Sequence, residues 1–358
     1  MLIIMMFIIF ILFLIPVNCF YTKPRITNKV LHSNSPKFWD ILSSNLKESA
    51  RNWFIQRAER TGIDWSAITN RYQKDLNKLE YIYNMKKNNS IVYPSYYTRP
   101  FHGYDDGNLN WLAAVEGEAA TLSMAVNYWK NNDPILTEQW LRYNISDNIK
   151  QYISLSNANE PKHLLDVGSS VGISTEYLYR AFGKTSRVEG LDLSPYFVAL
   201  ATYRAKEENL PLYYYHQNAE TPETKHKYDL IVCNFILHEI PKEPTKKIIK
   251  SLYELLNDGG VIAIVDLDAT KVKNDLIVST FRKWAFEVTE PHIYEYYNTD
   301  MNEILINEGF NNVMNCSNDP INTIWFGKKP HLCEAYNECY DTISSIKYKP
   351  KKRFLSLA

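Results

Sequence analysis

The sequence has few cysteines and no excess of charge of either sign. Its five cysteines among 358 residues include no C-x-x-C pair, so the usual spacing of a structural zinc site is missing. Forty basic residues balance forty acidic residues, whereas a dedicated nucleic-acid-binding protein normally carries a basic excess. We therefore expect neither a metal site nor a nucleic-acid partner. The 45% of hydrophobic residues are enough for a buried core.

The glycine turn near the middle of the chain lacks the motifs that hold a pyrophosphate. In LLDVGSSVGIST, residues 164–175, Gly168 and Gly172 follow the spacing G-x-x-x-G, not the G-x-G-x-x-G of dinucleotide-binding folds. No Gly-Lys-Ser/Thr follows, which excludes a P-loop. An NAD-dependent oxidoreductase is therefore disfavoured, although the two glycines still allow a ligand to approach the backbone closely.

The N-terminal segment lacks two features of an ordinary anchor or signal. Residues 2–15 are all apolar but fall short of the roughly 20 residues that span a bilayer, and no positive charge precedes them. We expect residues 1–19 to be a signal peptide or, as the alternative, an uncleaved anchor. Residues 20–37 are basic and contain no acid, which is the composition of a transit peptide.

Together these two segments resemble the bipartite leaders of proteins sent to secondary plastids, such as the apicoplast of apicomplexan parasites. We expect entry into the secretory pathway and a plastid location, with a secreted or membrane-anchored protein as the alternative. At the other end, residues 331–358 form a C-terminal tail. Its last part, residues 344–358, is basic and has no apolar periodicity.

Two regions lie between the leader and the tail, and they differ in apolar periodicity. From residue 159 to residue 330, short apolar runs alternate with helical patterns, which predicts βαβ units. The predicted fold class is therefore α/β and Rossmann-like, with helices on both faces of a mainly parallel sheet and a hairpin of strands at the end. One helix is expected to run from Pro244 to Gly260. Residues 38–158 are predicted to be a helical N-terminal or lid region, with one apolar face formed by Ile135, Trp140, Ile145, Ile149 and Ile153.

Polar side chains follow three of the predicted strands at the points where they end. Asp166 ends the first strand, Asp192 the second and Asn218 the third, with the backbone N–H of Ala219 beside it. Ligands bind beyond the carboxyl ends of the strands in an open parallel sheet, so we expect these groups at one ligand-binding edge. The carboxylate of Asp192 can accept both hydroxyls of a ribose, although many strand-end carboxylates are simple helix N-caps.

The order of these segments carries a family resemblance. Asp-x-Gly-x-x-x-Gly is followed by GLDLS, NAE, YDLIVCNFILHEI and LNDGGVIAIVD. Together they resemble class I S-adenosylmethionine-dependent methyltransferases, in particular the ubiquinone and menaquinone branch, over about residues 161–329. The resemblance implies a seven-stranded sheet of order 3-2-1-4-5-7-6. It also implies S-adenosylmethionine as the methyl donor and S-adenosylhomocysteine as the product.

The resemblance also assigns roles to the matching positions. Asp166, Gly168 and Gly172 would shape the pocket for the methionine half of the donor, with Asp166 near its ammonium group. Ser169 occupies a turn position that is often glycine or alanine in the family. Asp192 would hold the ribose. The other implied cofactor-binding positions are Leu193, Asn218 and Ala219 at the adenine, and Asn234 and Leu237 at the methyl group.

His238, in NFILHEIP, is the candidate catalytic residue. Methyl transfer from a sulfonium is an in-line displacement that depends mainly on positioning, and a general base is needed only when the acceptor must lose a proton. The ordinary pKa of histidine suits that task, and Glu239 could orient the ring. The alternative is that His238 only forms hydrogen bonds across its own loop.

A second candidate region lies before the sheet, in PSYYTRPFHGYDDGNLNW, residues 94–111. It resembles a segment of plant and algal plastid methyltransferases, and His102 and Tyr104 are its predicted substrate or lid residues. The alternative is an aromatic cluster that seats the helical region on the sheet. We expect methyl transfer to a small or lipid-like acceptor, with a donor-binding but inactive assembly or regulatory protein as the alternative. The apolar leader would allow membrane association.

Overall fold

The computed structural model describes residues 51–100, 104–129, 132–183, 186–224, 226–276 and 290–331. All of them belong to one compact unit. The predicted leader, the transit-like segment and the C-terminal tail after residue 331 lie outside these ranges, as does His102, so those expectations stay predictions. Within the described ranges, no helix combines the length and the apolar composition needed to cross a membrane.

A seven-stranded sheet forms the centre of the fold, and its order, β3-β2-β1-β4-β5-β7-β6, confirms the predicted one. The first five strands are parallel, and β7 enters antiparallel between β5 and β6. All the parallel strands therefore end at the same edge of the sheet. The strands are β1 (His163–Val167), β2 (Arg187–Asp192), β3 (Leu212–His216), β4 (Tyr228–Asn234), β5 (Leu256–Leu267), β6 (Asn311–Ser317) and β7 (Asn322–Lys328).

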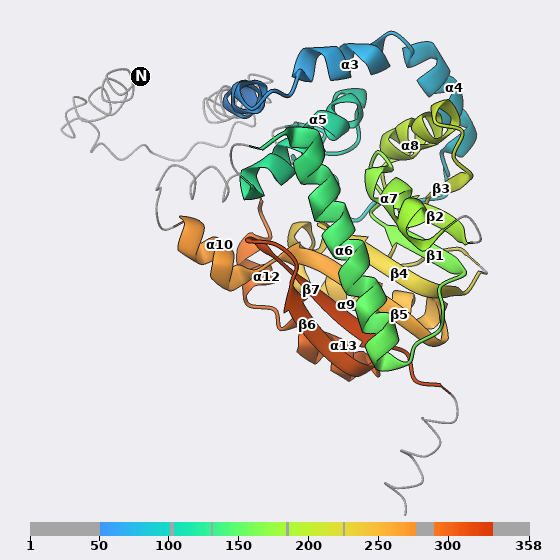
Figure 1. Cartoon of the computed structure of the whole chain (residues 1–358). Helices are drawn as coiled ribbons and strands as arrows, with labels where there is room; N and C mark the ends of the chain where they lie inside the picture. The colour runs from blue at the N-terminus through green and yellow to red at the C-terminus, as the bar shows by residue number, and fades with distance from the viewer. Residues whose placement is uncertain are drawn as a thin grey trace, which may run out of the picture. The chain divides into compact units, whose positions relative to one another are not determined.

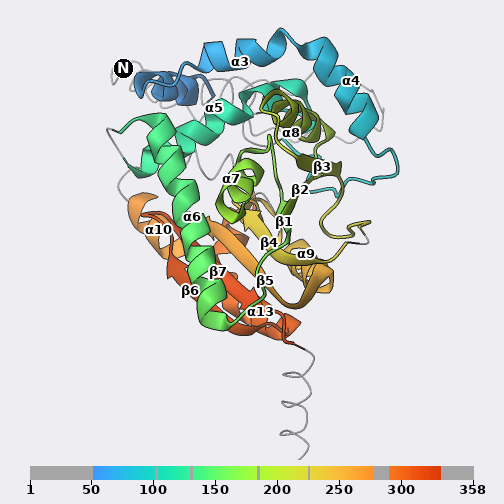
Figure 2. The same cartoon turned by 45° about the vertical axis from the view of Figure 1, so that its right-hand side comes forward.

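Helices cover both faces of the sheet (Figures 1 and 2). On one face, α6 (Pro134–Ser156) and α7 (Ile173–Phe182) pack over the central strands. On the other face lie α9 (Lys242–Leu255), α12 (Ile293–Tyr297) and α13 (Met301–Glu308). Between β2 and β3, α8 (Pro195–Glu207) begins where Ser194 accepts a hydrogen bond from the N–H of Phe197, with proline in the first turn.

The region before the sheet is helical, as the sequence predicts. Residues 51–60 form a helix, followed by α3 (Trp65–Gln73), α4 (Leu76–Lys86) and α5 (Trp111–Tyr128). An apolar cluster packs α4 and α5 against α8, so this region is seated directly on the sheet domain. The segment between α4 and α5 contains no helix in its described residues and lies near the ends of β2 and β3.

One element boundary differs from the prediction. The helix expected to run to Gly260 ends as α9 at Leu255, and β5 begins at the next residue. The cause is pairing between strands, because Leu256 pairs with Tyr228 of β4 before a bulge shifts the register. The glycines at this point therefore belong to an irregular strand, and they do not stop a helix.

Candidate functional site

The glycine turn after β1 forms the base of the site. The backbone N–H groups of Gly168 and Ser169 both donate to the carbonyl of Leu191 at the end of β2, at 2.8 and 3.0 Å. Gly168 has a φ of +70°, and a Cβ added there would lie 2.4 Å from Cγ2 of Ile236. Ser170 also adopts a positive φ, +47°, which is uncommon for a residue with a side chain. The turn therefore brings bare backbone to the edge of the sheet.

Asp166 is fully buried under this turn. Its Oδ2 accepts hydrogen bonds from the hydroxyl groups of Ser174 and Thr175 in the first turn of α7. Its Oδ1 lies 3.4 Å from Nδ2 of Asn234, at the end of β4. Burial raises the pKa of Asp166, although these hydrogen bonds and the charge of Arg142 act against the rise. The carboxylate thus ties β1, α7 and β4 together.

Asp192, at the end of β2, is also buried but is held differently. One carboxylate oxygen accepts from the N–H of Ser170 at 2.8 Å and the other from the N–H of Ser194 at 2.7 Å. Burial raises the pKa of Asp192 to about 6. The backbone of Leu193 adds a third hydrogen bond to the carboxylate. The two carboxylate oxygens offer about four lone-pair positions in all, so Asp192 is held rigidly by the backbone and still has capacity to accept from a ligand.

The end of β3 completes this side of the site. Oδ1 of Asn218 accepts from the N–H of Glu220 at 2.9 Å, while Ala219 is buried beneath it. Leu193 is half-buried beside Asp192. These positions face one edge together with the glycine turn, which is the arrangement that the sequence predicts for adenosine. Whether they contact a ligand stays a prediction.

Four buried polar atoms at this edge have no hydrogen-bond partner in the described part of the protein. They belong to the turn, to the end of β4 and to α6, which approaches from the side of the sheet that also carries α7. An unpartnered buried polar group costs about 1–3 kcal/mol, so this concentration indicates a ligand-binding edge with a polar ligand. The atoms are Oγ of Ser169, Oδ1 of Asn234, Oε2 of Glu138 and Nη1 of Arg142.

His238 lies in the short turn after β4, η1 (Leu237–Glu239), and faces the end of β5. Nδ1 of its ring lies 2.6 Å from Oδ1 of Asp266. Burial alone would lower the pKa of His238, but the charge and hydrogen bond of Asp266 outweigh it and raise that pKa to about 10. The ring is therefore protonated at neutral pH. The carboxylate at Nδ1 belongs to Asp266, not to Glu239.

The residues before His238, at the end of β4 and in the turn after it, differ in what they contact. Leu237 is fully buried in the core cluster against α9, and its N–H donates to Oδ2 of Asp266 at 2.9 Å. Asn234 ends β4 next to Asp166. Phe235 follows with a φ of +59°, a genuine outlier for a bulky residue, and its ring lies 5.5 Å from the guanidinium of Arg142. Backbone strain of this kind clusters at functional sites.

Residues 88–98, which we call the strap, lie across the ends of β2 and β3. The N–H of Asn88 donates to Nδ1 of His216 at 2.9 Å, and the hydroxyl of Tyr93 lies 3.2 Å from Nε2. His216 also contacts the carbonyl of Leu193 through Nε2, at 3.0 Å. Since Nδ1 accepts, the proton of the neutral ring is on Nε2. Burial lowers the pKa of His216 to about 4, so the ring stays neutral at physiological pH.

The strap also carries a tyrosine toward the site. The rings of Tyr93 and Tyr97 stack at 6.1 Å with an interplanar angle of 7°. Burial raises the pKa of Tyr97 well above its ordinary value, and the carboxylates of Asp192 and Glu239 add to the rise. Its hydroxyl therefore lies near both Asp192 at the end of β2 and Glu239 in the turn after β4. Tyr104 donates to Oε2 of Glu116 on α5 at 2.5 Å and packs against the apolar cluster that includes Val171 of the glycine turn.

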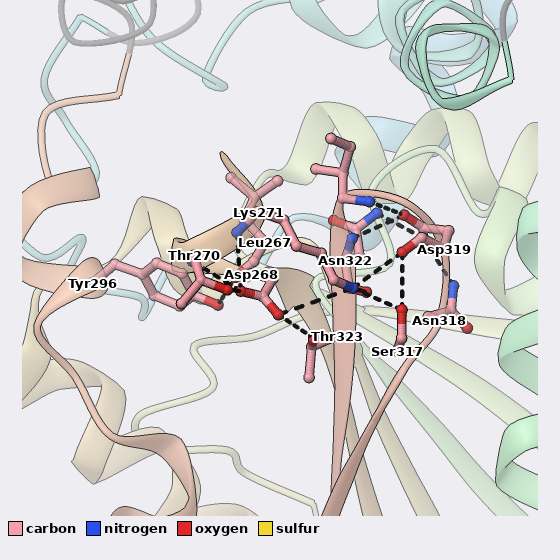
Figure 3. Close-up of polar contacts among 11 residues, drawn as sticks. Leu267, Asp268, Thr270, Lys271, Tyr296, Ser317, Asn318, Asp319, Asn322 and Thr323 are labelled. Atoms are coloured by element: carbon pink, nitrogen blue, oxygen red, sulfur yellow. Dashed lines mark hydrogen bonds and ion pairs between the residues drawn. The ribbon is translucent and has the colours of Figure 1, made fainter. Parts of the chain in front are cut away.

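A polar network lies beyond the end of β5 (Figure 3). The ammonium of Lys271, on α10 (Ala269–Leu276), donates to Oγ of Ser317 and to the carbonyls of Asp319 and Asn322, at 2.7, 3.1 and 2.9 Å. Asp268 caps α10 and accepts from the hydroxyl of Thr323. These contacts fasten α10 to the turn between β6 and β7.

On the other side of the same strand end, the hydroxyl of Tyr296 donates to the carbonyl of Leu267 at 2.9 Å, and its ring packs edge-on against His238. The network therefore links the end of β5 to the catalytic candidate. No group of three His, Cys, Asp or Glu side chains in the described ranges could hold a metal ion.

Sequence reasoning missed several of these residues. Glu138 and Arg142 are polar residues on a helix for which only an apolar face was predicted. His216 was predicted to lie in a strand but was given no role in the site. Asp266 ends the quoted motif LNDGGVIAIVD, and its position at a strand end was the one available signal. Tyr97 lies in the aromatic block that was singled out for His102 and Tyr104.

The chain was compared with known proteins. Residues 138–315 match the family model described as a methyltransferase domain. Erythromycin 3''-O-methyltransferase of Saccharopolyspora erythraea is 28% identical over 161 residues, which cover 44% of this chain and 50% of that protein. Ubiquinone biosynthesis O-methyltransferase of Sodalis glossinidius is 31% identical over 103 residues, 28% of this chain and 39% of that protein.

Among solved structures, an S-adenosylmethionine-dependent methyltransferase from Clostridium acetobutylicum matches with 24% identity and a TM-score of 0.34. The match covers 37% of this chain and 54% of that one. The chain thus spans half the length or less of the two curated relatives named above.

Proposed function

Because the chain carries a class I S-adenosylmethionine-dependent methyltransferase domain, we propose that it transfers the methyl group of S-adenosylmethionine to a small-molecule acceptor. The observation that carries this proposal is the buried carboxylate of Asp192. It is held by the backbone N–H of Ser170 in the glycine turn and that of Ser194 after β2, and it still has lone-pair capacity for a ligand. That geometry suits the two vicinal hydroxyls of a ribose.

The residues at the strand ends fit the donor. The turn of Gly168 provides backbone without a side chain, the half-buried Leu193 offers an apolar surface for a base, and the unpartnered atoms Oγ of Ser169 and Oδ1 of Asn234 face the same edge. When bound, the donor supplies an electrophilic methyl group on a sulfonium and leaves as neutral S-adenosylhomocysteine. The chain's own residues therefore have mainly to position two reactants and exclude water.

The pairing of His238 with Asp266 determines whether His238 can act as a general base or as a hydrogen-bond donor toward the acceptor. A ring that is protonated at neutral pH cannot accept a proton, so it suits donation of a hydrogen bond better than general-base catalysis. We propose that His238 orients the acceptor. A base role would require acceptor binding to lower the pKa of the ring by several units.

The relatives support a small-molecule acceptor. The two named above are an erythromycin methyltransferase and an enzyme of ubiquinone biosynthesis, and both are O-methyltransferases. The aromatic strap and Tyr296 around the site suit an apolar or planar acceptor, including a lipid-like one.

Calorimetry tests the proposal directly. Purified protein titrated with S-adenosylmethionine and S-adenosylhomocysteine should bind both, whereas NAD should give no heat. Substitution of Asp192 by alanine should weaken both affinities at least tenfold, because two charge-assisted hydrogen bonds are lost. No binding of either compound by the wild type would reject the methyltransferase assignment.

The alternative is a donor-binding protein without turnover, which serves assembly or regulation. Both functions predict donor binding, so binding alone does not separate them. Incubation with radiolabelled donor and a metabolite extract separates them, because only an enzyme transfers label to a small molecule in a manner that needs the intact donor site. Label transfer by the wild type but not by Asp192→Ala would support the enzyme.

A further inference from the structure

A second histidine lies close to His238 at the edge where the parallel strands end. His292 immediately precedes α12, and its carbonyl accepts the N–H of Tyr296 one helical turn further on, at 3.0 Å. The ring of Tyr296 packs edge-on against that of His238, with the ring centres 6.3 Å apart. Ile293 and Leu237 belong to one apolar cluster, so α12 packs directly on the turn that carries His238. Because side chains four residues apart on a helix lie on one face, His292 lies on the same face as Tyr296.

The strap contacts His292 from another side. The ring of Tyr96 lies edge-on to the imidazole, with the ring centres 6.4 Å apart and an interplanar angle of 89°. The hydroxyl of Tyr96 donates to Oε1 of Glu220 at 2.8 Å, just beyond the end of β3. The next residue of the strap, Tyr97, lies near Asp192. His292 is therefore found where the strap, α12 and the turn after β4 meet, beside the proposed donor site.

The ring of His292 has a nitrogen that the fold does not use. The ring is half-buried, and its Nε2 is buried without a hydrogen-bond partner among the residues that the structure describes. An unpartnered buried polar atom costs about 1–3 kcal/mol, so it calls for a ligand group or another explanation. Burial lowers the pKa of His292; the charge of Glu295 acts against this change and that of Arg99 adds to it. The ring is therefore neutral at pH 7.

The two histidines at this point thus differ in charge. His238 is protonated because the carboxylate of Asp266 lies at its Nδ1, so it cannot accept a proton. His292 is neutral and can accept one. Methylation of a hydroxyl group releases a proton, whereas methylation of a carboxylate releases none. A neutral histidine beside the donor site therefore suits a hydroxyl acceptor.

We propose that His292 is the general base of the reaction and that the acceptor atom is the oxygen of a hydroxyl group. A lone pair of that oxygen forms the new bond to the methyl carbon, while the carbon–sulfur bond breaks and leaves its electron pair on sulfur. The proton of the hydroxyl passes to Nε2 of His292. The products are a methyl ether, a neutral thioether and an imidazolium ring. This inference rests on the proposed function and names the acceptor chemistry at the same site.

Chemical rescue tests the base. Radiolabelled S-adenosylmethionine and a metabolite extract serve as substrates, and calorimetry with S-adenosylhomocysteine measures the donor site separately. His292→Ala should lower label transfer by about a hundredfold or more, keep the donor affinity within about twofold, and regain activity when imidazole is added. The matched control is His163→Ala, which removes an exposed histidine at the start of β1, at the opposite end of that strand from the site. It should transfer label normally and not respond to imidazole.

Full label transfer by His292→Ala would overturn the proposal. So would a loss of transfer that imidazole does not restore, because that result fits a positioning or structural role. No donor binding by the wild type would reject the methyltransferase assignment itself. The labelled product tests the acceptor independently, since the label of a methyl ether resists mild alkali whereas a methyl ester releases it as volatile methanol. Volatile label would show that the acceptor is a carboxylate.

A measurement on the wild type does not depend on turnover or on the folding of His292→Ala. Nitrogen-15 NMR of the histidine rings, with S-adenosylhomocysteine bound at pH 7, distinguishes neutral from protonated imidazole. The signals of His292 and His238 are assigned from the variants His292→Gln and His238→Gln. His292 should be neutral with one nitrogen that carries no proton, and His238 should be protonated. A protonated His292 at pH 7 would exclude it as the base.

Discussion

The carboxylate of Asp266 lies 2.6 Å from Nδ1 of His238 and also accepts the backbone N–H of the same residue at 3.2 Å. One carboxylate thus fixes both the ring and the backbone of the turn after β4. Because Asp266 is fully buried, the pair behaves as a buried ion pair that also shapes a loop.

We expect Asp266→Asn to lower the free energy of unfolding by about 3 kcal/mol at pH 7, because it leaves a buried protonated ring without its partner. Urea unfolding followed by circular dichroism measures this. His238→Gln is the control, since it keeps the backbone N–H donors to Asp266 and removes the charge. A loss below about 1 kcal/mol in Asp266→Asn would contradict a buried ion pair.

The raised pKa of His238 also predicts how stability depends on pH. The contribution of a group whose folded pKa is raised is complete below its unfolded value of about 6.5 and is lost as the pH rises through about 10. The unfolding free energy of the wild type should therefore fall more steeply between pH 7 and pH 10 than that of His238→Gln. Parallel curves would show that the ring is neutral in the folded state.

The affinity for the donor should depend on pH below neutrality. Burial raises the pKa of Asp192 to about 6, so its carboxylate gains a proton as the pH falls from 7 to 5. A protonated carboxyl accepts ribose hydroxyls poorly, and the affinity for S-adenosylhomocysteine should fall over this range. Asp192→Asn should bind weakly at every pH, with a flatter profile. A wild-type affinity that is constant from pH 5 to pH 7 would exclude Asp192 as the titrating group.

Gly168→Ala should destabilise the protein by at least about 2 kcal/mol and weaken donor binding. The new Cβ would meet Ile236 at 2.4 Å, and the positive φ costs about 1–2 kcal/mol for a residue with a side chain. Gly62→Ala is the matched control, because Gly62 has a φ of +92° but no neighbour within 4 Å. If both variants melt at the same temperature, the contact with Ile236 does not contribute to the destabilisation.

His216→Phe should increase the dissociation rate of S-adenosylhomocysteine severalfold. The substitution removes the ring nitrogens through which Asn88 and Tyr93 of the strap contact β3, so the strap opens more readily. Surface plasmon resonance measures the rate. Tyr93→Phe removes a single hydroxyl contact with His216 and should have a smaller effect. An unchanged rate in His216→Phe would show that the strap does not cover the donor.

Lys271→Met should lower the free energy of unfolding by about 2 kcal/mol while leaving the affinity for S-adenosylhomocysteine unchanged. Three hydrogen bonds of a charged group are lost, each to an oxygen between Ser317 and Asn322. Thr323→Val removes a single hydroxyl contact with the carboxylate of Asp268 and should cost less. A loss of donor affinity in Lys271→Met would mean that the network reaches the donor site.

The fold was predictable because its signals are local. Each parallel strand is a short apolar run that ends in a turn residue, and the alternation with helices leaves few possible topologies. The start of β5 was not predictable in this way. The pairing of Leu256 with Tyr228 joins residues far apart in the sequence, and it overrides the tendency of glycines to end a helix.

The site was predictable only where its residues follow a strand directly. Gly168 and Asp192 meet that condition, whereas Arg142 does not. On α6 the predicted apolar face is buried at Ile145 and Ile149, whereas Ile135 and Trp140 near the start of the helix are 59% and 41% exposed. In this first part of the helix Glu138 and Arg142 face inward instead, and burial of a charged pair is the case that hydrophobic periodicity cannot detect.

The position of β7 determines when the sheet can be completed during synthesis. β7 lies between β5 and β6, and among the described residues it is the last strand along the chain. During synthesis the edge of β5 therefore stays unpaired until residue 328 has left the ribosome. Such an edge can pair with other chains. We therefore infer that chains truncated before β7 aggregate although all of β1–β5 is present, and that the sheet is completed only once β7 has been made.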